Sequence, residues 1–245
     1  MKETEKRKEL RINQLRRFAD ENHIPVQNIE LLNTALTHTS YANEHKNEVI
    51  HDNERLEFLG DAVLDLVVGE YLFLRFPSWR EGELTRAKAS AVCKPACAEC
   101  AAKFRIGEYM RLGKGEEMSG GRTRVSILGD AFEAVIGAIY LDNDYRVASR
   151  FILGHLKKFL DLIDSGDYDH DYKTDLQELV QQHGEADIQY QVIHDEGPDH
   201  DKTIWMEISI HGKAFGRGIG KNKKEAAQRA AKEAIQKIRS GELTV

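Results

Sequence analysis

Four carboxylates occur at helical spacing in the stretch that begins at residue 53. The stretch opens Asn-Glu-Arg-Leu-Glu-Phe-Leu-Gly-Asp, and its acidic residues Glu54, Glu57, Asp61 and Asp65 are separated by three, four and four positions. On a helix these intervals place the four side chains on one face, where like charges repel one another. The apolar positions predict burial: Leu56, Phe58, Leu59, Val63, Leu64, Leu66, Val67 and Val68. Buried acids need a cation nearby, whereas the acids of an amphipathic surface helix would face water.

A second stretch, residues 127–141, favours the buried alternative. It is apolar nearly throughout, which is typical of a helix inside a core. Its only charged residues, Asp130 and Glu133, share one helical face, and no Lys or Arg within the stretch can pair with them. If Glu57 and Asp61 face this pair, the four carboxylates form an all-oxygen site. Mg²⁺ prefers such ligands, and the usual chemistry there is metal-assisted phosphoryl transfer.

Three segments resemble the bacterial ribonuclease III family, whose members are endonucleases of double-stranded RNA. Residues 53–61 look like the signature nonapeptide of that family, and residues 128–134 are similar to its second acidic motif. Residues 38–44 resemble the segment that precedes the signature. The resemblance extends over nearly the whole chain, from about residue 10 to residue 238.

The resemblance implies a fold, a site and an activity. The fold is an all-α endonuclease domain followed by a small α-β-β-β-α domain. Glu57, Asp61, Asp130 and Glu133 are then the ligands of Mg²⁺, with Mn²⁺ as a substitute, and Asp61 and Glu133 are expected to be catalytic. The expected reaction cleaves double-stranded RNA to 5′-phosphate and 3′-hydroxyl ends with short 3′ overhangs. Its expected roles are the processing of ribosomal-RNA precursors and the processing and turnover of mRNA.

Family resemblance also implies a homodimer. Glu54 and Glu81 match acidic positions at the subunit contact, so they are expected to support the interface or RNA rather than to bind metal. Phe58, an aromatic residue beside the acids, is a candidate dimer contact, with a plain core position as the alternative.

Composition fits two soluble domains. The chain has 245 residues, of which 41% are hydrophobic, and its net charge of −6 does not by itself suggest a nucleic-acid partner. Residues 213–239, however, contain nine basic and two acidic residues, so the overall charge hides a basic strip. The charged N-terminus does not resemble a signal peptide, and no run approaches the roughly 20 apolar residues of a membrane helix. We therefore expect a cytoplasmic protein without a membrane partner.

The three cysteines are expected to be structural thiols. Cys93, Cys97 and Cys100 occur at i, i+4 and i+7 in an Ala-rich stretch, which is the pattern of a buried helical face. Cys97 and Cys100 have metal-ligand spacing, but no second pair of Cys or His residues completes a zinc site. Free thiols fit a reducing cytoplasm.

The first domain, residues 1–164, is expected to be helical nearly throughout. Besides the two acidic stretches, the predicted helices are residues 29–37, 83–104 and 146–163, and the signature helix is expected to run from 54 to 76, where Pro77 ends it. Residues 38–53 and the Gly-rich residues 113–121 are expected to be mostly loop. His38 is a candidate base, but a histidine before a helix more often caps or packs.

Residues 165–172 are small, polar and acidic, and they predict an interdomain linker. The linker contains Asp and His residues, for which a metal site is the alternative to a solvated tether. Beyond it, residues 173–241 predict helix, three strands and helix, with Asn222 capping the last helix. This order resembles a double-stranded-RNA-binding domain, which reads A-form RNA by shape over about 16 base pairs.

That second resemblance implies three regions of RNA contact. They are the first helix, the loop between the first two strands, and the start of the last helix, with residues Gln177, Glu178, Pro198, His200, Lys221, Lys223 and Lys224. The first two regions are expected to enter minor grooves and the lysines to contact phosphates. A run of lysines on a solvated surface is the alternative interpretation.

Two other classes of function remain open at the level of sequence. One is a regulator that binds double-stranded RNA and whose large domain only dimerises, which would predict the loss of a carboxylate. The other is a metal-dependent phosphohydrolase of small molecules that carries an RNA tether. All four carboxylates are present, which favours the nuclease.

Overall fold

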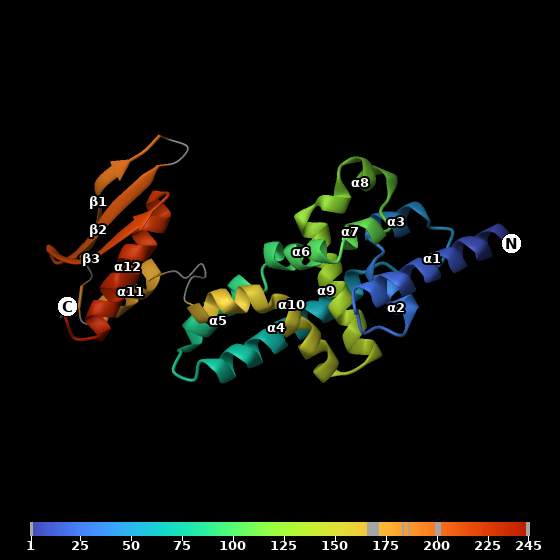
Figure 1. Cartoon of the computed structure of the whole chain (residues 1–245), viewed down its shortest axis with the longest axis horizontal. Coiled ribbons are helices and arrows are strands. Elements are labelled where there is room, and N and C mark those ends of the chain that lie inside the picture. Colours follow the sequence, from blue (N-terminus) through green and yellow to red (C-terminus); the bar gives the residue numbers. More distant parts are fainter. Residues whose placement is uncertain (1, 166–171, 183, 186, 199–201, 244–245) are drawn as a thin grey trace. The chain divides into compact units, whose positions relative to one another are not determined.

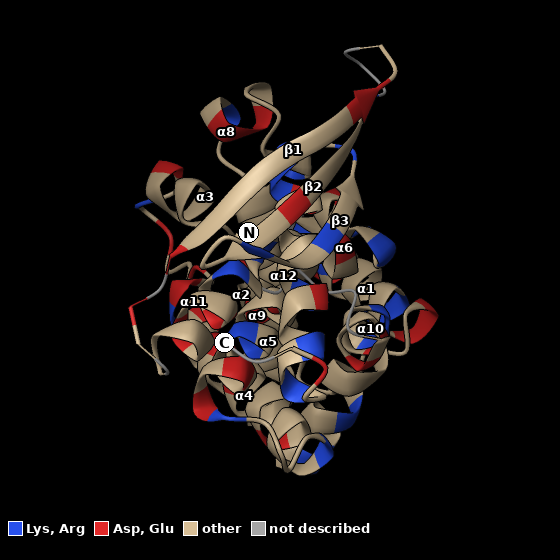
Figure 2. Ribbon diagram, turned by 90° about the vertical axis from the view of Figure 1, so that its left-hand side faces the viewer, with Lys and Arg blue, Asp and Glu red and all other residues tan. Residues whose placement is uncertain are grey.

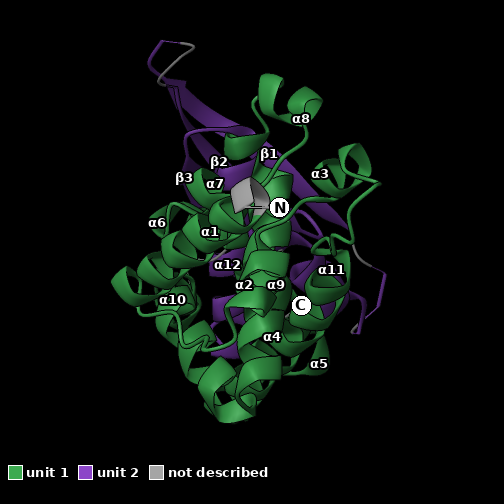
Figure 3. Ribbon diagram, turned by 90° about the vertical axis from the view of Figure 1, so that its right-hand side faces the viewer, with its two compact units in different colours: residues 1–168 green, residues 169–245 purple. Residues whose placement is uncertain are grey.

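The computed structural model describes residues 2–165, 172–182, 184–185, 187–198 and 202–243. The chain forms two compact units, Met1–Tyr168 and Asp169–Val245 (Figure 1 and Figure 3). Their boundary falls inside the segment predicted to be a linker, and residues 166–171 of that segment lie outside the described residues. No helix among the described residues is long and apolar enough to cross a membrane.

The first unit is helical, as predicted. Its elements are α1 (Lys2–Glu21), α2 (Ile29–Ala35), α3 (Thr39–Glu44), α4 (Glu54–Arg75), α5 (Glu81–Ala91), α6 (Lys94–Lys103), α7 (Ile106–Tyr109), α8 (Lys114–Met118), the 3₁₀ turn η1 (Gly121–Thr123), α9 (Val125–Asp142) and α10 (Tyr145–Ser165). Helix α9 is the buried acidic helix of the sequence, and α4, α6 and α10 pack around it.

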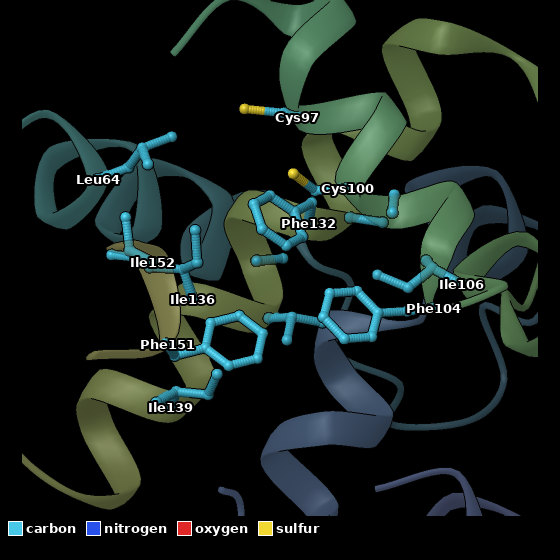
Figure 4. Packing of buried hydrophobic residues seen from close by; sticks show 14 of the residues in the cluster. Leu64, Cys97, Cys100, Phe104, Ile106, Phe132, Ile136, Ile139, Phe151 and Ile152 are labelled. Carbon is cyan, nitrogen blue, oxygen red and sulfur yellow. The ribbon is translucent and has the colours of Figure 1, made fainter. Parts of the chain in front are cut away.

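The core of this unit is built around the apolar side chains of α9. Phe132 lies 6.2 Å from Phe104 and 6.1 Å from Phe151, measured between ring centroids, and Phe104 and Phe151 stack at 5.6 Å. Figure 4 shows these rings with Ile136 and Ile139 of α9 pointing into the same space. The burial of α9 on nearly all sides confirms what its apolar sequence indicates.

Helices α4 and α9 cross at two glycines and touch through their backbones. A Cβ atom on Gly60 would lie 1.7 Å from the carbonyl oxygen of Glu133, and one on Gly137 would lie 2.3 Å from the carbonyl oxygen of Leu56. Only glycine allows two helices to approach so closely. This crossing fixes the position of the acidic residues that neighbour it on both helices.

The predicted helix over residues 83–104 is wrong as a single helix. The structure divides it into α5 and α6, with Cys93 in an extended conformation at the start of α6. Pro95 explains the break: it has no amide hydrogen to donate to the preceding turn, and its ring would clash with the carbonyl one turn back. In the first turn of a helix neither problem arises, so α6 begins beside the proline.

Two predicted loops also contain short helices. Within residues 38–53, His38 caps α3, and its Nδ1 accepts a hydrogen bond from the backbone N–H of Ser40 at 3.2 Å. Within residues 113–121, an ion pair between Glu117 and Arg122 at 2.5 Å connects α8 to η1. One of these interactions is a helix cap and the other involves a residue outside the segment, and hydrophobic periodicity predicts neither.

Helix α4 ends one residue before the predicted limit, with Phe76 as its C-cap, but not all of its apolar residues are buried. Phe58 is 80% exposed, Leu66 60% and Phe73 67%. The predicted burial is therefore wrong for Phe58 and Leu66, and Phe73 on the same face is exposed as well. That face is left without cover within the described part of the chain.

The second unit has the predicted α-β-β-β-α order. It consists of α11 (Tyr172–Gln181), β1 (Ile188–Glu196), β2 (Thr203–Ile210), β3 (Lys213–Gly220) and α12 (Lys223–Arg239). The sheet is antiparallel in the order β1-β2-β3. Strand β2 alternates between buried and partly exposed positions, and its buried side chains pack with α11 and α12.

Alternate glycines on β3 allow α12 to lie directly on the sheet. A Cβ atom on Gly216 would lie 2.4 Å from the carbonyl oxygen of Ala230, and one on Gly218 would lie 2.2 Å from that of Ala226. The two glycines are two residues apart and therefore share the face that α12 covers. Small residues on both surfaces, glycines on β3 and alanines on α12, therefore let the helix pack closely against the sheet.

Candidate metal centre and RNA interface

Three of the four predicted metal ligands lie together in the first unit. Ligand oxygens of Glu57, Asp130 and Glu133 all lie within 4.8 Å of one another. Glu57 comes from α4, and the other two come from successive turns of one face of α9. Glu133 is 3% exposed, whereas Glu57 and Asp130 are half-buried. Among the described residues this is the one group of His, Cys, Asp or Glu side chains placed to hold an ion.

The fourth predicted ligand, Asp61, lies one turn further along α4 and is exposed. It is not part of the group of three, but its charge contributes to the raised pKa of Glu133, so the two carboxylates lie near each other. Asp65, the next acid on the same face, has a partner of its own in Lys88, whose Nζ donates a hydrogen bond to it at 2.6 Å.

Lys94, at the start of α6, places its ammonium group among the three clustered carboxylates. Its Nζ lies 2.9 Å from Glu133 Oε2 and 3.6 Å from Glu57 Oε1, and it also donates a hydrogen bond to Asp130 Oδ1. The acids of α9 thus have a cationic partner, which the sequence of α9 alone does not contain. No local sequence signal points to Lys94, because the acids of α9 that it contacts lie 36 and 39 positions further along the chain.

The surroundings of Glu57 and Glu133 raise the pKa of both carboxyl groups. Burial raises the pKa of Glu133, and the charges of Asp61 and Glu57 act in the same direction, while the hydrogen bond from Lys94 opposes them. Burial and the charge of Asp130 likewise raise the pKa of Glu57. Burial lowers the pKa of Lys94, but its hydrogen bonds to Asp130 and Glu133 outweigh this effect and hold the pKa above its usual range.

The donor set fits a hard divalent cation. All the candidate ligands are carboxylate oxygens, which suit Mg²⁺ and Mn²⁺ and do not suit softer ions. Burial is the main cause of the raised pKa values of Glu57 and Glu133, and repulsion from neighbouring carboxylates adds to it even with Lys94 present. A divalent ion would relieve that repulsion.

The other acidic residues predicted to have a role in the first unit lie at its surface. Glu54 lies exposed in the first turn of α4, and Glu81 lies exposed at the start of α5, where it accepts a hydrogen bond from Thr85 Oγ1 at 2.9 Å. Neither belongs to the cluster of three. His38 has the capping role described above rather than a place among the acids.

Cysteines contribute no ligand to the cluster. Cys97 and Cys100 are buried free thiols, as predicted, whereas Cys93 is only half-buried because it caps α6 rather than lying on its inner face. Burial raises the pKa of Cys100 to about 11 and holds that of Cys97 above its ordinary range.

The predicted RNA contacts of the second unit are exposed wherever they are described. Gln177 and Glu178 lie on the outer face of α11, and Pro198 follows β1; His200 lies outside the described residues. The lysines stand at the start of α12: Lys221, Lys223 and Lys224.

The start of α12 is a well-formed helix terminus. Asn222 caps it, as predicted, because its side chain accepts a hydrogen bond from the backbone N–H of Glu225 at 2.9 Å. Acidic and basic residues are interspersed over β2, β3 and α12 (Figure 2). Some of the basic strip is therefore neutralised: Arg217 pairs with Glu207 at 2.7 Å and Arg229 with Glu225 at 2.6 Å.

Comparison with known proteins agrees with this architecture. Residues 28–160 match the family model described as ribonuclease-III-like, and residues 172–238 match the double-stranded RNA binding motif. Ribonuclease 3 of Desulforamulus reducens is 47% identical over 211 residues, which cover 86% of each chain. Ribonuclease 3 of Geobacillus thermodenitrificans is 46% identical over 221 residues, which cover 89% of each chain.

A solved structure matches the first unit. The nuclease domain of ribonuclease III from Campylobacter jejuni superimposes with a TM-score of 0.53 at 40% identity, covering 58% of this chain and 94% of that one. It is described as showing structural flexibility in a region involved in dimer formation. A helical nuclease unit followed by a double-stranded-RNA-binding motif defines a two-domain endoribonuclease. This chain belongs to the ribonuclease III family.

Proposed function

We propose that the protein is a Mg²⁺-dependent endoribonuclease that cleaves double-stranded RNA to 5′-phosphate and 3′-hydroxyl ends. The observation that carries the proposal is the convergence of Glu57, Asp130 and Glu133 from two helices onto one small volume, with Asp61 nearby. Acids that share one site and repel one another are suited to a divalent cation.

The residues of the site have distinct roles in this proposal. Glu57, Asp130 and Glu133 hold the ion, with Mn²⁺ as a substitute for Mg²⁺, and the exposed Asp61 completes the site on the side open to substrate. A bound divalent cation supplies positive charge that favours the ionisation of water and stabilises the departing 3′ oxygen. Glu133 is the most deeply buried of the three ligands, and its carbonyl oxygen lies at the backbone contact between α4 and α9.

The proposed assembly is a homodimer. Phe58, Leu66 and Phe73 lie exposed along α4, and apolar side chains of this size are expected to be covered by a partner. Glu54, at the start of the same helix, and Glu81 are placed to support such an interface or the RNA. A two-fold dimer matches the approximate two-fold symmetry of duplex RNA, so each site would cut one strand and staggered cuts would leave short 3′ overhangs.

The second unit is proposed to supply affinity for the duplex. The exposed Gln177 and Glu178, the loop that contains Pro198 and His200, and the three lysines at the start of α12 would contact successive grooves and the phosphates between them. The proposed substrates are ribosomal-RNA precursors and structured mRNA. A cytoplasmic location accords with the three free thiols.

The test is Glu133→Gln, which preserves the size of the side chain and removes its charge. We expect cleavage of long duplex RNA in Mg²⁺ to be abolished while duplex binding in a gel-shift assay is retained, because the lysines of α12 are untouched. Glu99→Gln is the matched control: Glu99 pairs with Lys158 at 2.9 Å on the surface, so its loss should leave cleavage intact. Cleavage by Glu133→Gln at the wild-type rate would show that the ligand assignment is wrong.

The same preparation separates the proposal from its two rivals. A protein that only binds RNA would leave duplex RNA intact with or without Mg²⁺. A phosphohydrolase of small molecules would release phosphate from mononucleotides. The proposed enzyme cuts duplex RNA in the presence of Mg²⁺ and leaves mononucleotides unchanged.

A further inference from the structure

Lys94 is the one side chain that contacts all three clustered carboxylates, among the interactions of the described residues. It comes from α6, whereas the acids come from α4 and α9, so three helices contribute to one arrangement. Its Nζ approaches one oxygen of each acid: Oε1 of Glu57, Oδ1 of Asp130 and Oε2 of Glu133. The ammonium therefore lies where ligand oxygens converge.

Packing holds the stem of Lys94 in this position. A Cβ atom on Gly129, the buried residue before Asp130, would lie 3.0 Å from Lys94 Cδ and 3.3 Å from its carbonyl oxygen. The absence of a side chain at position 129 thus leaves the space through which the lysine passes. Pro95 fixes the first turn of α6, and this restricts the backbone from which the side chain extends.

The side chain of Lys94 is also accessible to solvent. The side chain of Lys94 is 43% exposed, and that of Glu133 is 4% exposed, so the lysine reaches a buried acid from the solvent side. A long, flexible lysine side chain can leave such a position without a change in the backbone.

A divalent ion and the ammonium group would compete for the same three carboxylates. Two cations cannot share one set of ligand atoms at contact distance, because their repulsion is strong in a partly buried site. A metal ion that binds Glu57, Asp130 and Glu133 must therefore displace Lys94 and break its contacts with all three.

We propose that Lys94 is a built-in competitor for the metal ion, a positioning residue that holds the three carboxylates together in the absence of metal and sets the affinity of the site. The inference rests on the proposed function, since it assumes that the cluster binds a divalent cation. It has two consequences. Lys94 stabilises the metal-free protein against unfolding, and binding of a metal ion breaks the contacts of Lys94 with the three carboxylates.

The experiment compares Lys94→Met with wild type in the full-length protein. Methionine keeps much of the length of the side chain and removes its charge. Binding of Mn²⁺ and Mg²⁺ is measured directly by titration calorimetry, and thermal unfolding is followed in EDTA and in Mg²⁺. We expect the variant to bind metal about tenfold tighter or more, which corresponds to the loss of a competing interaction of ordinary strength. In EDTA it should unfold at a lower temperature, and Mg²⁺ should raise its midpoint by more than it raises that of wild type.

Two further variants serve as controls. Lys88→Met removes a lysine that pairs with Asp65 outside the cluster, so its metal affinity should stay within about twofold of wild type. Lys94→Arg keeps the competing charge and should retain weak binding, which separates an effect of charge from an effect of packing. If Lys94→Met does not fold well enough for calorimetry, Lys94→Gln provides the same comparison with a polar side chain.

The outcomes distinguish the inference from the proposed function. Absence of metal binding by both wild type and Lys94→Met would overturn the metal site itself and the inference with it. Binding by wild type with equal or weaker binding by Lys94→Met would overturn the inference alone. Tighter binding together with lower stability in EDTA supports both of its parts.

Discussion

Replacing Gly60 with alanine would push a methyl group into the backbone of the facing helix. The added Cβ would lie 1.7 Å from the carbonyl oxygen of Glu133 and 2.9 Å from the amide nitrogen of Gly137. Both atoms belong to the backbone of α9, so no side chain can rotate to make room. The helices would have to part by about 1.3 Å to restore even the 3.0 Å below which real Cβ contacts are essentially never seen.

The net effect combines two opposing contributions. Overpacking of a rigid contact costs about 3 kcal/mol. Alanine is better than glycine inside a helix by about 1 kcal/mol, which offsets part of that cost. We therefore expect a net destabilisation of about 2 kcal/mol, equivalent to a fall of about 4–8 °C in the unfolding midpoint of a unit of this size.

The assay is thermal unfolding followed by far-UV circular dichroism, fitted with one transition for each unit. The transition of the second unit serves as an internal reference, because Gly60 lies in the first. Gly69→Ala is the matched control on the same helix, since its Cβ would meet nothing closer than Lys88 Cδ at 4.0 Å. The control should be as stable as wild type or more stable, by up to about 1 kcal/mol.

Metal affinity gives a second measurement on the same variant. Because separation of α4 from α9 moves Glu57 away from Glu133, Gly60→Ala should bind Mg²⁺ more weakly than Gly69→Ala. A Gly60→Ala protein that is as stable as the control and binds metal as tightly would refute the claim that this backbone contact positions the site.

Two other predictions concern the cysteines and the second unit. At about pH 8 a thiol reagent should modify the half-buried Cys93 in the native protein and leave Cys97 and Cys100 unmodified, because burial raises the pKa of both and keeps them protonated; complete modification without unfolding would contradict this. Gly218→Ala, whose Cβ would lie 2.2 Å from the carbonyl oxygen of Ala226, should unfold the second unit, so that duplex RNA is still cut at low salt but not near physiological salt. Unchanged salt dependence of cleavage in a protein shown to have lost that unit would refute the proposed role of the unit in binding.

The sequence predicted the long elements better than the short ones. A nearly continuous apolar character indicated α9 and most of α4, and runs of strand-favouring residues indicated the strands of the second unit, because these signals come from many residues at once. The single helix expected over residues 83–104 was wrong because one proline, Pro95, outweighs the helix preference of the alanines around it. Helix α3 was missed because six residues held by a His38 cap carry no periodic signal.

The burial of α4 was predicted correctly for one face and incorrectly for another. Val63, Leu64 and Val67 are in the core, but Phe58 and Leu66 are exposed. Apolar character shows that a residue is favoured away from water, but it does not show what covers that residue. A surface left for a second subunit and a surface facing the core have the same composition.

The candidate site shows most clearly what the sequence determined and what the tertiary structure decided. Spacing alone placed Glu57 with Asp61 and Asp130 with Glu133, because residues three or four apart on a helix share a face whatever surrounds them. That Glu57 would meet Asp130 and Glu133 depended on the backbone contact at Gly60 and Gly137, which no local pattern specifies. Lys94 lies 36 positions before Asp130, and its contact with the acids follows only from the packing of α6 against α9. Local geometry is set by the chain itself, whereas a contact between distant residues exists only once the core has fixed how the helices cross.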